Sequence, residues 1–143
     1  MRTIKFRGKI VLGIEPLAMK KGHWVEGHYY EDLQDGVWCS WIKECDDILH
    51  YKVDKETVGQ FTGLLDKNGT EIYEGDIIGC HNPDIKHLIF YNEKQGRFMA
   101  ALNGDIDNDF VGVCGLDDSR WNASKEVIGN IHDTPELLKG GAE

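Results

Sequence analysis

Hydrophobic and polar residues alternate in short runs along most of this chain, and turn-forming residues separate the runs. In residues 3–7, Ile4 and Phe6 alternate with polar or charged positions, the period-two pattern of a half-buried strand. Later runs rich in aromatic and β-branched residues are GHWVEGHYYE, DGVWCSWIK, KHLIFYNEKQGRFMAAL, FVGVCGL and KEVIGNI. Because these residue types favour strands, the pattern predicts a mainly β fold.

Two dipeptides mark predicted hairpins. In TGLLDKNGTEIYEGDII, residues 62–78, Asn68 and Gly69 tolerate the positive φ that a two-residue type I′ turn needs at both positions. Short apolar arms flank this turn and can pair as a hairpin. Asp35-Gly36 predicts a second hairpin between two aromatic-rich runs, and Asn103-Gly104 marks a further turn.

Residues 37–43 fit two patterns. Trp38, Trp41, Ile42, Cys45, Ile48 and Leu49 also follow helical spacing. The density of β-branched and aromatic residues, and the place of Gly36 before them, favour a strand.

Two short helices are expected. Asp54 can cap a single helical turn over residues 55–57, which Gly59 would end. Near the C-terminus, Thr134 as N-cap and Pro135 at the first helical position predict one short helix.

Glu74, Gly75 and Asp76 form the second notable feature of residues 62–78. One interpretation is a carboxylate pair for acid–base chemistry or a divalent ion. The interpretation that we favour is structural, because acids beside a glycine between strands usually accept hydrogen bonds from backbone N–H groups or water.

Charge is unevenly distributed around a net value of −9. Residues 1–24 carry net +5, residues 25–53 net −5 and residues 54–143 net −9. An acidic body is a poor match for general nucleic-acid binding, where neutralisation of phosphates supplies most of the affinity. The asymmetry suits contact between subunits, and it also suits a solvated acidic surface that keeps the protein soluble.

Metal-ligand patterns are incomplete. Asp105, Asp107 and Asp109 match the first ligands of a calcium loop, but Phe110 stands where that loop needs Gly and Leu116 where it needs Glu. Zinc-ligand types occur without paired C-x-x-C spacing, at Cys39, Cys45, Cys80, His81 and His87. Neither common nucleotide-binding glycine motif is present. We therefore predict no catalytic, cofactor or metal residues.

The location expected from the sequence is the cytoplasm. No stretch approaches eighteen apolar residues, and charges interrupt the apolar positions of MRTIKFRGKI, so neither a membrane span nor a signal peptide is expected. In that compartment the four cysteines are expected to be thiols rather than disulfides: Cys39, Cys45, Cys80 and Cys114.

Five aromatic residues fall within eighteen positions and are candidates for a partner surface: Trp24, Tyr29, Tyr30, Trp38 and Trp41. Such a group can form a stacking platform for bases or proline-rich peptides. Burial in a core or subunit contact is the commoner use of large rings. Any of them that are exposed would mark a protein–protein surface.

Three segments carry a family resemblance: IKFRG, VDKETVGQFTGLLDKNGTEIYEGDII (residues 53–78) and KEVIGNIHDTPELL (residues 125–138). Together they resemble the YopX family, small proteins of phage and prophage genomes, while residues 8–50 match it only loosely. The resemblance implies one domain over residues 1–143, with an N-terminal β-rich subdomain (1–53), then an SH3-like barrel and a C-terminal helical turn (54–143). It supplies no catalytic residues.

The function expected is that of a non-enzymatic phage accessory protein that self-associates and binds a host or phage protein. A second hypothesis is a nucleic-acid-associated protein that uses the barrel and the basic residues Lys5, Arg7 and Lys9. A third is an acidic DNA mimic using the acids of residues 105–118. An enzyme using Glu74 and Asp76 comes last.

Overall fold

The computed structural model describes residues 3–11, 22–44, 49–80, 82, 84–106, 110–112 and 125–142. Within these ranges the chain forms two antiparallel sheets and 3-10 helices, with no α-helix. The mainly β prediction is thereby confirmed. No helix in the described ranges is long and apolar enough to span a membrane.

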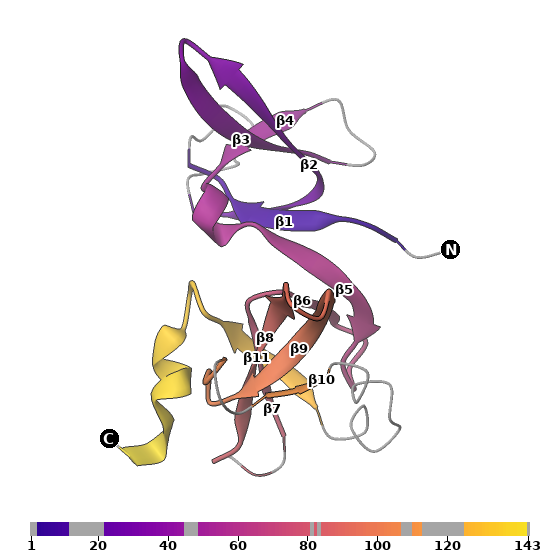
Figure 1. The fold of residues 1–143 in the computed structure, drawn as a ribbon, viewed down its shortest axis with the longest axis vertical. Helices are drawn as coiled ribbons and strands as arrows, with labels where there is room; N and C mark the ends of the chain where they lie inside the picture. The colour runs from indigo at the N-terminus through magenta and orange to yellow at the C-terminus, as the bar shows by residue number, and fades with distance from the viewer. Residues whose placement is uncertain are drawn as a thin grey trace. The chain divides into compact units, whose positions relative to one another are not determined.

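The strands in chain order are β1 (Phe6–Lys9), β2 (Trp24–Gln34), β3 (Val37–Lys43), β4 (His50–Val53), β5 (Gly59–Leu65), β6 (Glu71–Tyr73), β7 (Asp76–Gly79), β8 (Lys86–Asn92), β9 (Arg97–Leu102), β10 (Phe110–Gly112) and β11 (Glu126–Asn130) (Figure 1). The 3-10 helices are η1 (Lys55–Thr57) and η3 (Pro135–Ala142). The chain divides into two compact units, Met1–Phe61 and Thr62–Glu143. The single-domain organisation, with its division at residues 53 and 54, stays a prediction.

In the first unit the strands pair in the order β4-β3-β2-β1-β5. An isolated bridge joins Ile10 to Val53, and the Val11 N–H donates to the Lys52 carbonyl at 3.0 Å, so β4 meets the continuation of β1. This return curls the strands around one apolar cluster. Its buried members are Ile10, Val25, Ile42, Tyr51 and Val53.

The hairpin of β2 and β3 has the tight turn that the sequence predicted. Asp35 and Gly36 both have positive φ, 50° and 81°, and Gln34 lies directly opposite Val37. A two-residue turn with this geometry matches the twist of the flanking strands. The strand prediction for residues 37–43 is also confirmed, so Trp38, Trp41 and Ile42 lie on a strand despite their helical spacing.

Gly27 is the point at which β2 changes neighbours. Before it, β2 pairs with β1, ending with Gly27 opposite Phe6; after it, β2 pairs with β3 from His28 opposite Lys43. A Cβ on Gly27 would overlap the backbone carbonyl of Lys43. Only glycine allows the two backbones to approach this closely.

The predicted turn of helix after β4 is present as η1. Asp54 accepts a hydrogen bond from the Glu56 N–H at 3.1 Å, the capping contact that the sequence indicated. Thr57 is buried, and its hydroxyl accepts from the Lys9 N–H at 2.9 Å. η1 is therefore fastened to β1.

The second unit contains the five-stranded sheet in the order β10-β9-β8-β7-β11. β5 continues into this unit and pairs with β6. The buried core comes from β6 to β9 and consists of Ile72, Ile78, Ile89, Met99 and Ala100, with Leu64, Phe90, Phe98 and Val127 packed against it.

The Asn68-Gly69 turn differs from the prediction. The hairpin of β5 and β6 is present, but Gly69 alone has positive φ (83°) and Asn68 does not. The Gly69 N–H donates to the Asp66 carbonyl, and the Asp66 N–H donates to the Thr70 carbonyl. This is a three-residue loop that ends with a left-handed glycine, so the two-residue type I′ assignment was wrong.

Asp66 explains the difference. Its carboxylate is 7% exposed and accepts from the Asn68 and Thr70 N–H groups at 2.8 and 2.9 Å, and from the Val127 N–H at 2.9 Å. Burial raises the pKa of this carboxyl, but the three backbone donors and Lys67 outweigh burial, so the pKa lies below its usual value. Asp66 thus holds the hairpin loop to β11.

The C-terminal helix is a 3-10 helix, η3. The Thr134 hydroxyl accepts from the Asn130 N–H at 3.2 Å, and the Leu137 N–H donates to the Thr134 carbonyl at 3.1 Å. A helix was predicted here, and the structure gives it the tighter winding common in short pieces.

We expect Asp66→Asn to lower the free energy of unfolding by about 1–3 kcal/mol at pH 7, because the amide cannot accept the bond from the Val127 N–H. A lowered carboxylate pKa stabilises the fold above the pKa of the unfolded state, about 3.9, and this contribution is lost as pH falls through the folded-state pKa. The gap between wild type and variant should therefore narrow below about pH 4 in urea titrations.

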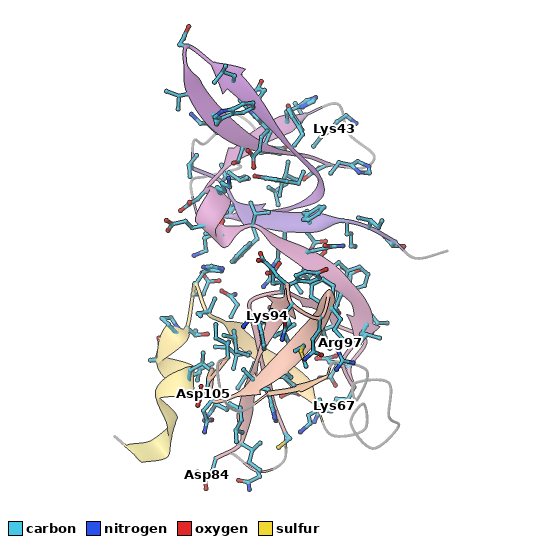
Figure 2. The ribbon with its side chains drawn as sticks, in the orientation of Figure 1. Lys43, Lys67, Asp84, Lys94, Arg97 and Asp105 are labelled. Carbon is cyan, nitrogen blue, oxygen red and sulfur yellow. The ribbon has the colours of Figure 1, made fainter. Side chains whose placement is uncertain are left out.

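Asp84→Asn is the matched control, since Asp84 is exposed in the same unit (Figure 2) and should behave like wild type. A gap that stays constant from pH 7 to pH 2.5 would show that the Asp66 charge is not what the loop uses.

We also expect Gly27→Ala to lower the free energy of unfolding by about 1–3 kcal/mol, because the added methyl displaces the Lys43 carbonyl. The control is Glu26→Ala, one residue earlier on the outer side of β2, with an expected cost of about 0.5 kcal/mol. Equal urea midpoints for Gly27→Ala and wild type would contradict the close approach.

Candidate interaction surface

Strand alternation divides the side chains of the first unit between an inner and an outer face. Val25, Tyr29 and Ile42 point inward and belong to or pack against the apolar cluster. Alternate residues of the same strands point outward. We call this second side the outer face; it carries Lys5, Arg7, Lys9, Trp24, Glu26, His28, Tyr30, Asp32, Trp41, Lys43, His50 and Lys52.

Tyr30, Trp41 and His50 form an ordered group on the outer face, here called the Tyr30 cluster. Tyr30 lies directly opposite Trp41, with ring centroids 6.4 Å apart and planes 11° from parallel. His50 meets Tyr30 edge-on at 5.6 Å, and its Nδ1 lies 2.6 Å from the Tyr30 hydroxyl. Trp41 Nε1 donates to Asp32 Oδ1 at 2.7 Å. The Tyr30 hydroxyl, the His50 Nδ1 and the Trp41 Nε1 thus each have a hydrogen-bond partner, which restrains the rings.

The pKa of the Tyr30 phenol is raised above its usual value. Partial burial raises its pKa, and the negative charge of Asp32 raises it further. Tyr30 thus stays a neutral hydroxyl, able to exchange a hydrogen bond with His50.

Two basic side chains of β1 lie over the ring of Trp24. The Arg7 guanidinium lies 4.7 Å from the Trp24 ring centroid, and the Lys9 Nζ lies 5.5 Å from it. Lys5 pairs with Glu26 at 3.7 Å. The basic residues that the sequence singled out therefore make contacts within the unit, of the cation–π and ion-pair kinds.

Tyr29 belongs to the inner face. Its ring lies 5.7 Å from Phe6, and its hydroxyl contacts Glu31 at 2.7 Å and Ser40 at 3.1 Å. Burial raises the pKa of Tyr29, and Glu31 adds to the rise while Ser40 opposes it. The bond from Tyr29 is the main cause of a lowered pKa for Glu31, with help from Lys55 at 3.4 Å.

The end of the β2–β3 hairpin exposes three large apolar side chains, which we call the hairpin tip. Leu33 is 57% exposed, Val37 62% and Trp38 67%. Leu33 lies directly opposite Trp38 on one side of the hairpin, and Val37 lies on the other. The ribbon shows this hairpin reaching beyond β1 and β4 (Figure 1). The aromatic pattern of the sequence predicted a role for Trp38 but not for Leu33 and Val37, although the position of both beside a two-residue turn was an available signal.

The five predicted aromatic residues thus do not form one patch. Tyr30 and Trp41 come together, Trp24 lies further along the same face under its cations, Tyr29 faces the core and Trp38 belongs to the hairpin tip. Lys43 marks the base of the hairpin, opposite His28 (Figure 2).

Glu74 and Gly75 form the turn between β6 and β7, and Asp76 is the first residue of β7. Asp76 is 1% exposed, and its carboxylate accepts from the Tyr73 N–H at 2.7 Å. Gly75 has φ 92°, donates to the Ile89 carbonyl and accepts from the Ile131 N–H. The geometry around Asp76 is that of a turn held by its own carboxylate.

Among the described residues no three His, Cys, Asp or Glu side chains are grouped to hold a metal ion. Cys39 and Cys80 are free thiols; Cys39 is buried and contacts the Val37 carbonyl. The other positions weighed from the sequence lie outside the described residues: Cys45, His81, Asp107, Asp109 and Cys114.

The fold and surface define a mainly β chain in which, among the residues with a described surface, the three most exposed large apolar side chains lie on one projecting hairpin. A family model described as YopX protein matches residues 18–139, so the chain belongs to the YopX family. The family resemblance is thereby confirmed. No curated protein matches the chain. A crystal structure of protein EF1440 from Enterococcus faecalis aligns with a TM-score of 0.48 and 25% identity, covering 96% of this chain and 99% of that one.

We expect the Tyr30 and Trp41 rings to be energetically coupled by about 0.5–1.5 kcal/mol, as offset or stacked aromatic pairs are. A double-mutant cycle of Tyr30→Ala and Trp41→Ala in urea measures this coupling. The control cycle pairs Leu33→Ala with Trp41→Ala, whose side chains lie on opposite faces, and should give a value near zero. Equal couplings in the two cycles would deny the ring contact.

Proposed function

We propose that this YopX-family chain is a non-enzymatic accessory protein, encoded by a phage or prophage and acting in the bacterial cytoplasm, that binds a host or phage protein and self-associates. The observation that carries the proposal is the hairpin tip. Three large apolar side chains are more than half exposed on one hairpin, where water contact is costly. Tryptophan in such a position is a frequent anchor of protein interfaces.

The hairpin is well suited to present an anchor. The two-residue turn and the β2–β3 ladder fix its backbone, and the Tyr30 cluster stiffens its outer face. A rigid anchor loses little conformational entropy on binding, so more of its apolar contact remains as affinity.

A catalytic role is less well supported. Asp76, one of the two acids considered for catalysis, is almost fully buried and bonded to the Tyr73 N–H. A group held in this way stabilises a turn, whereas a general acid or base must reach a substrate.

The nucleic-acid alternative is weakened by the contacts of its basic residues. Arg7 and Lys9 lie on Trp24, and Lys5 pairs with Glu26. Cations engaged in this way are half-buried and offer less charge to phosphates.

We also propose that the second unit forms an SH3-like barrel. Support comes from the core, where Ile72 of β6 packs with the residues of the five-stranded sheet. The Lys67 N–H donates to the Lys125 carbonyl at 3.1 Å beside the Asp66–Val127 bond, so the hairpin loop lies against the start of β11.

The test of the protein-interaction role is capture from lysate of the bacterium that carries the gene, with nuclease-treated samples in parallel. We expect one defined protein to survive nuclease, and the double variant Leu33→Ser, Trp38→Ser to reduce its recovery at least about tenfold, as loss of two anchors should. Ile106→Ser is the control, since Ile106 is 46% exposed elsewhere on the chain.

Recovery of nucleic acid alone, lost as salt rises and lost with Lys5, Arg7 and Lys9 changed to Glu, would replace this proposal with the second hypothesis. Light scattering on the purified chain tests self-association: a monomer at every concentration would refute that part.

A further inference from the structure

One edge of the projecting hairpin is open. β1 pairs with residues 24–27 of β2 only, while β3 covers the other side of residues 28–34. Among the described residues no strand pairs with the β1 side of residues 28–34. The side chains of this stretch are largely exposed, including Tyr30, Glu31, Leu33 and Gln34.

The turn determines which backbone groups point to that edge. In a two-residue hairpin the residues that flank the turn, here Gln34 and Val37, exchange backbone hydrogen bonds with each other. Alternate residues of β2 therefore bond to β3, and the residues between them direct their N–H and C=O groups away from it. Those residues are Tyr29, Glu31 and Leu33.

The chemistry of the open edge is acidic and apolar. Residues 22–42 contain four acids and no lysine or arginine. Glu31 lies in the middle of the edge, where the Tyr29 hydroxyl donates to it and the largely exposed Lys55 Nζ lies 3.4 Å from it. A cationic strand would therefore compete with Lys55 for this carboxylate. Leu33 with its neighbour Trp38 lies at the end of the edge. A strand added here would face a carboxylate and, two residues along, an apolar pair.

The chain itself contains an example of the strand that fits β2. β1 has the sequence FRGK, pairs antiparallel with β2, and places Arg7 opposite Glu26. Lys5 Nζ reaches the same Glu26 at 3.7 Å. Where this edge of β2 is covered, the added strand therefore brings basic residues to an acid of β2.

A second copy of β2 is a poor occupant. The antiparallel register that pairs all of residues 28–34 with their copies places Glu31 opposite Glu31, and like charges directly opposite one another are destabilising. Charge complementarity favours a different chain with a cationic strand.

We propose that residues 28–34 of β2 are a strand-addition site for an extended segment of the partner protein, with a Lys or Arg opposite Glu31 and an apolar residue beside Leu33 and Trp38. Backbone hydrogen bonds to Tyr29, Glu31 and Leu33 provide the attachment, and the side chains provide the selection. This inference rests on the proposed protein-interaction function and specifies the partner's chemistry.

The probe is a capped, fluorescein-labelled peptide, Thr-Ile-Thr-Lys-Thr-Ile-Thr, in which the lysine that faces Glu31 has an isoleucine two residues away on either side, the spacing from Glu31 to Leu33. Anisotropy measures its binding to the full chain. The control peptide has the same sequence with three consecutive central residues N-methylated, which keeps the charge and removes the N–H donors on both edges. We expect the parent peptide to bind and the methylated one to lose at least about tenfold in affinity, as loss of two or more hydrogen bonds implies.

Two substitutions in the protein test the edge directly. Glu31→Gln should weaken the peptide about two- to fivefold, the value of a cross-strand charge pair. Asp35→Asn removes the same charge from the turn, keeps a residue that tolerates positive φ, and should leave affinity within about twofold. Leu33→Pro removes an outward N–H that the β2–β3 ladder does not use, and should weaken the peptide about tenfold.

Amide exchange locates the contact independently of these variants. On peptide binding, the amides of Tyr29, Glu31 and Leu33 should gain protection. Equal binding of the parent and methylated peptides, absence of binding by the parent, or protection elsewhere would each overturn the strand-addition site.

The two proposals can fail separately. If a partner protein is captured equally by wild type and by baits carrying Leu33→Pro or Glu31→Gln, binding does not use this edge, while the interaction role stands. If the wild-type chain captures no protein, the proposed function fails whatever the peptide does.

Discussion

The close approach of β2 to the end of β3 at Gly27 is the constraint on which the first unit depends. Because Gly27 has no Cβ that would overlap the Lys43 carbonyl, the two backbones can come together there, and β2 changes its partner from β1 to β3. One strand thereby serves two neighbours in succession. Its first part closes over the core with Val25, and its second part leaves the core and becomes half of a projecting hairpin. Had β1 continued along the whole of β2, neither the tip nor the open edge would exist.

The two-residue turn then determines what the hairpin displays. It places Gln34 opposite Val37, and from that pair the register assigns every other residue to a face. Tyr30 and Trp41 meet on the outer face, where His50 and Asp32 satisfy their polar atoms. Leu33 and Trp38 meet on the opposite side, but beyond the reach of the core. The same alternation that buries Tyr29 and Ile42 near the base therefore leaves apolar side chains exposed at the tip.

Local patterns predicted the elements well and the contacts between distant segments poorly. Asp35-Gly36 and Asn68-Gly69 are equally good turn dipeptides, yet only the first forms the two-residue turn. The second is altered by Asp66, whose carboxylate binds the Asn68 and Thr70 N–H groups and also Val127, 61 residues away. A short sequence pattern cannot predict the bond to Val127, because the two residues are far apart in the chain. The aromatic group shows the same limit: its members were identified, but their division among the core, the outer face and the tip depends on a register that only the paired strands define.

The acids of β2 can be understood as a solution to the hazard of an open edge. Natural sheets protect such edges with lysine, proline, bulges or short strands, and residues 28–34 contain neither lysine nor proline. Glu31 protects the edge against pairing with a second copy of β2, since that copy would place one carboxylate opposite another. The same charge leaves the edge open to a cationic strand, as the ion pair between Lys5 and Glu26 of β2 illustrates within the chain. Discrimination of this kind needs no pocket, because repulsion excludes the chain's own copies while backbone bonding and the apolar tip hold a complementary strand.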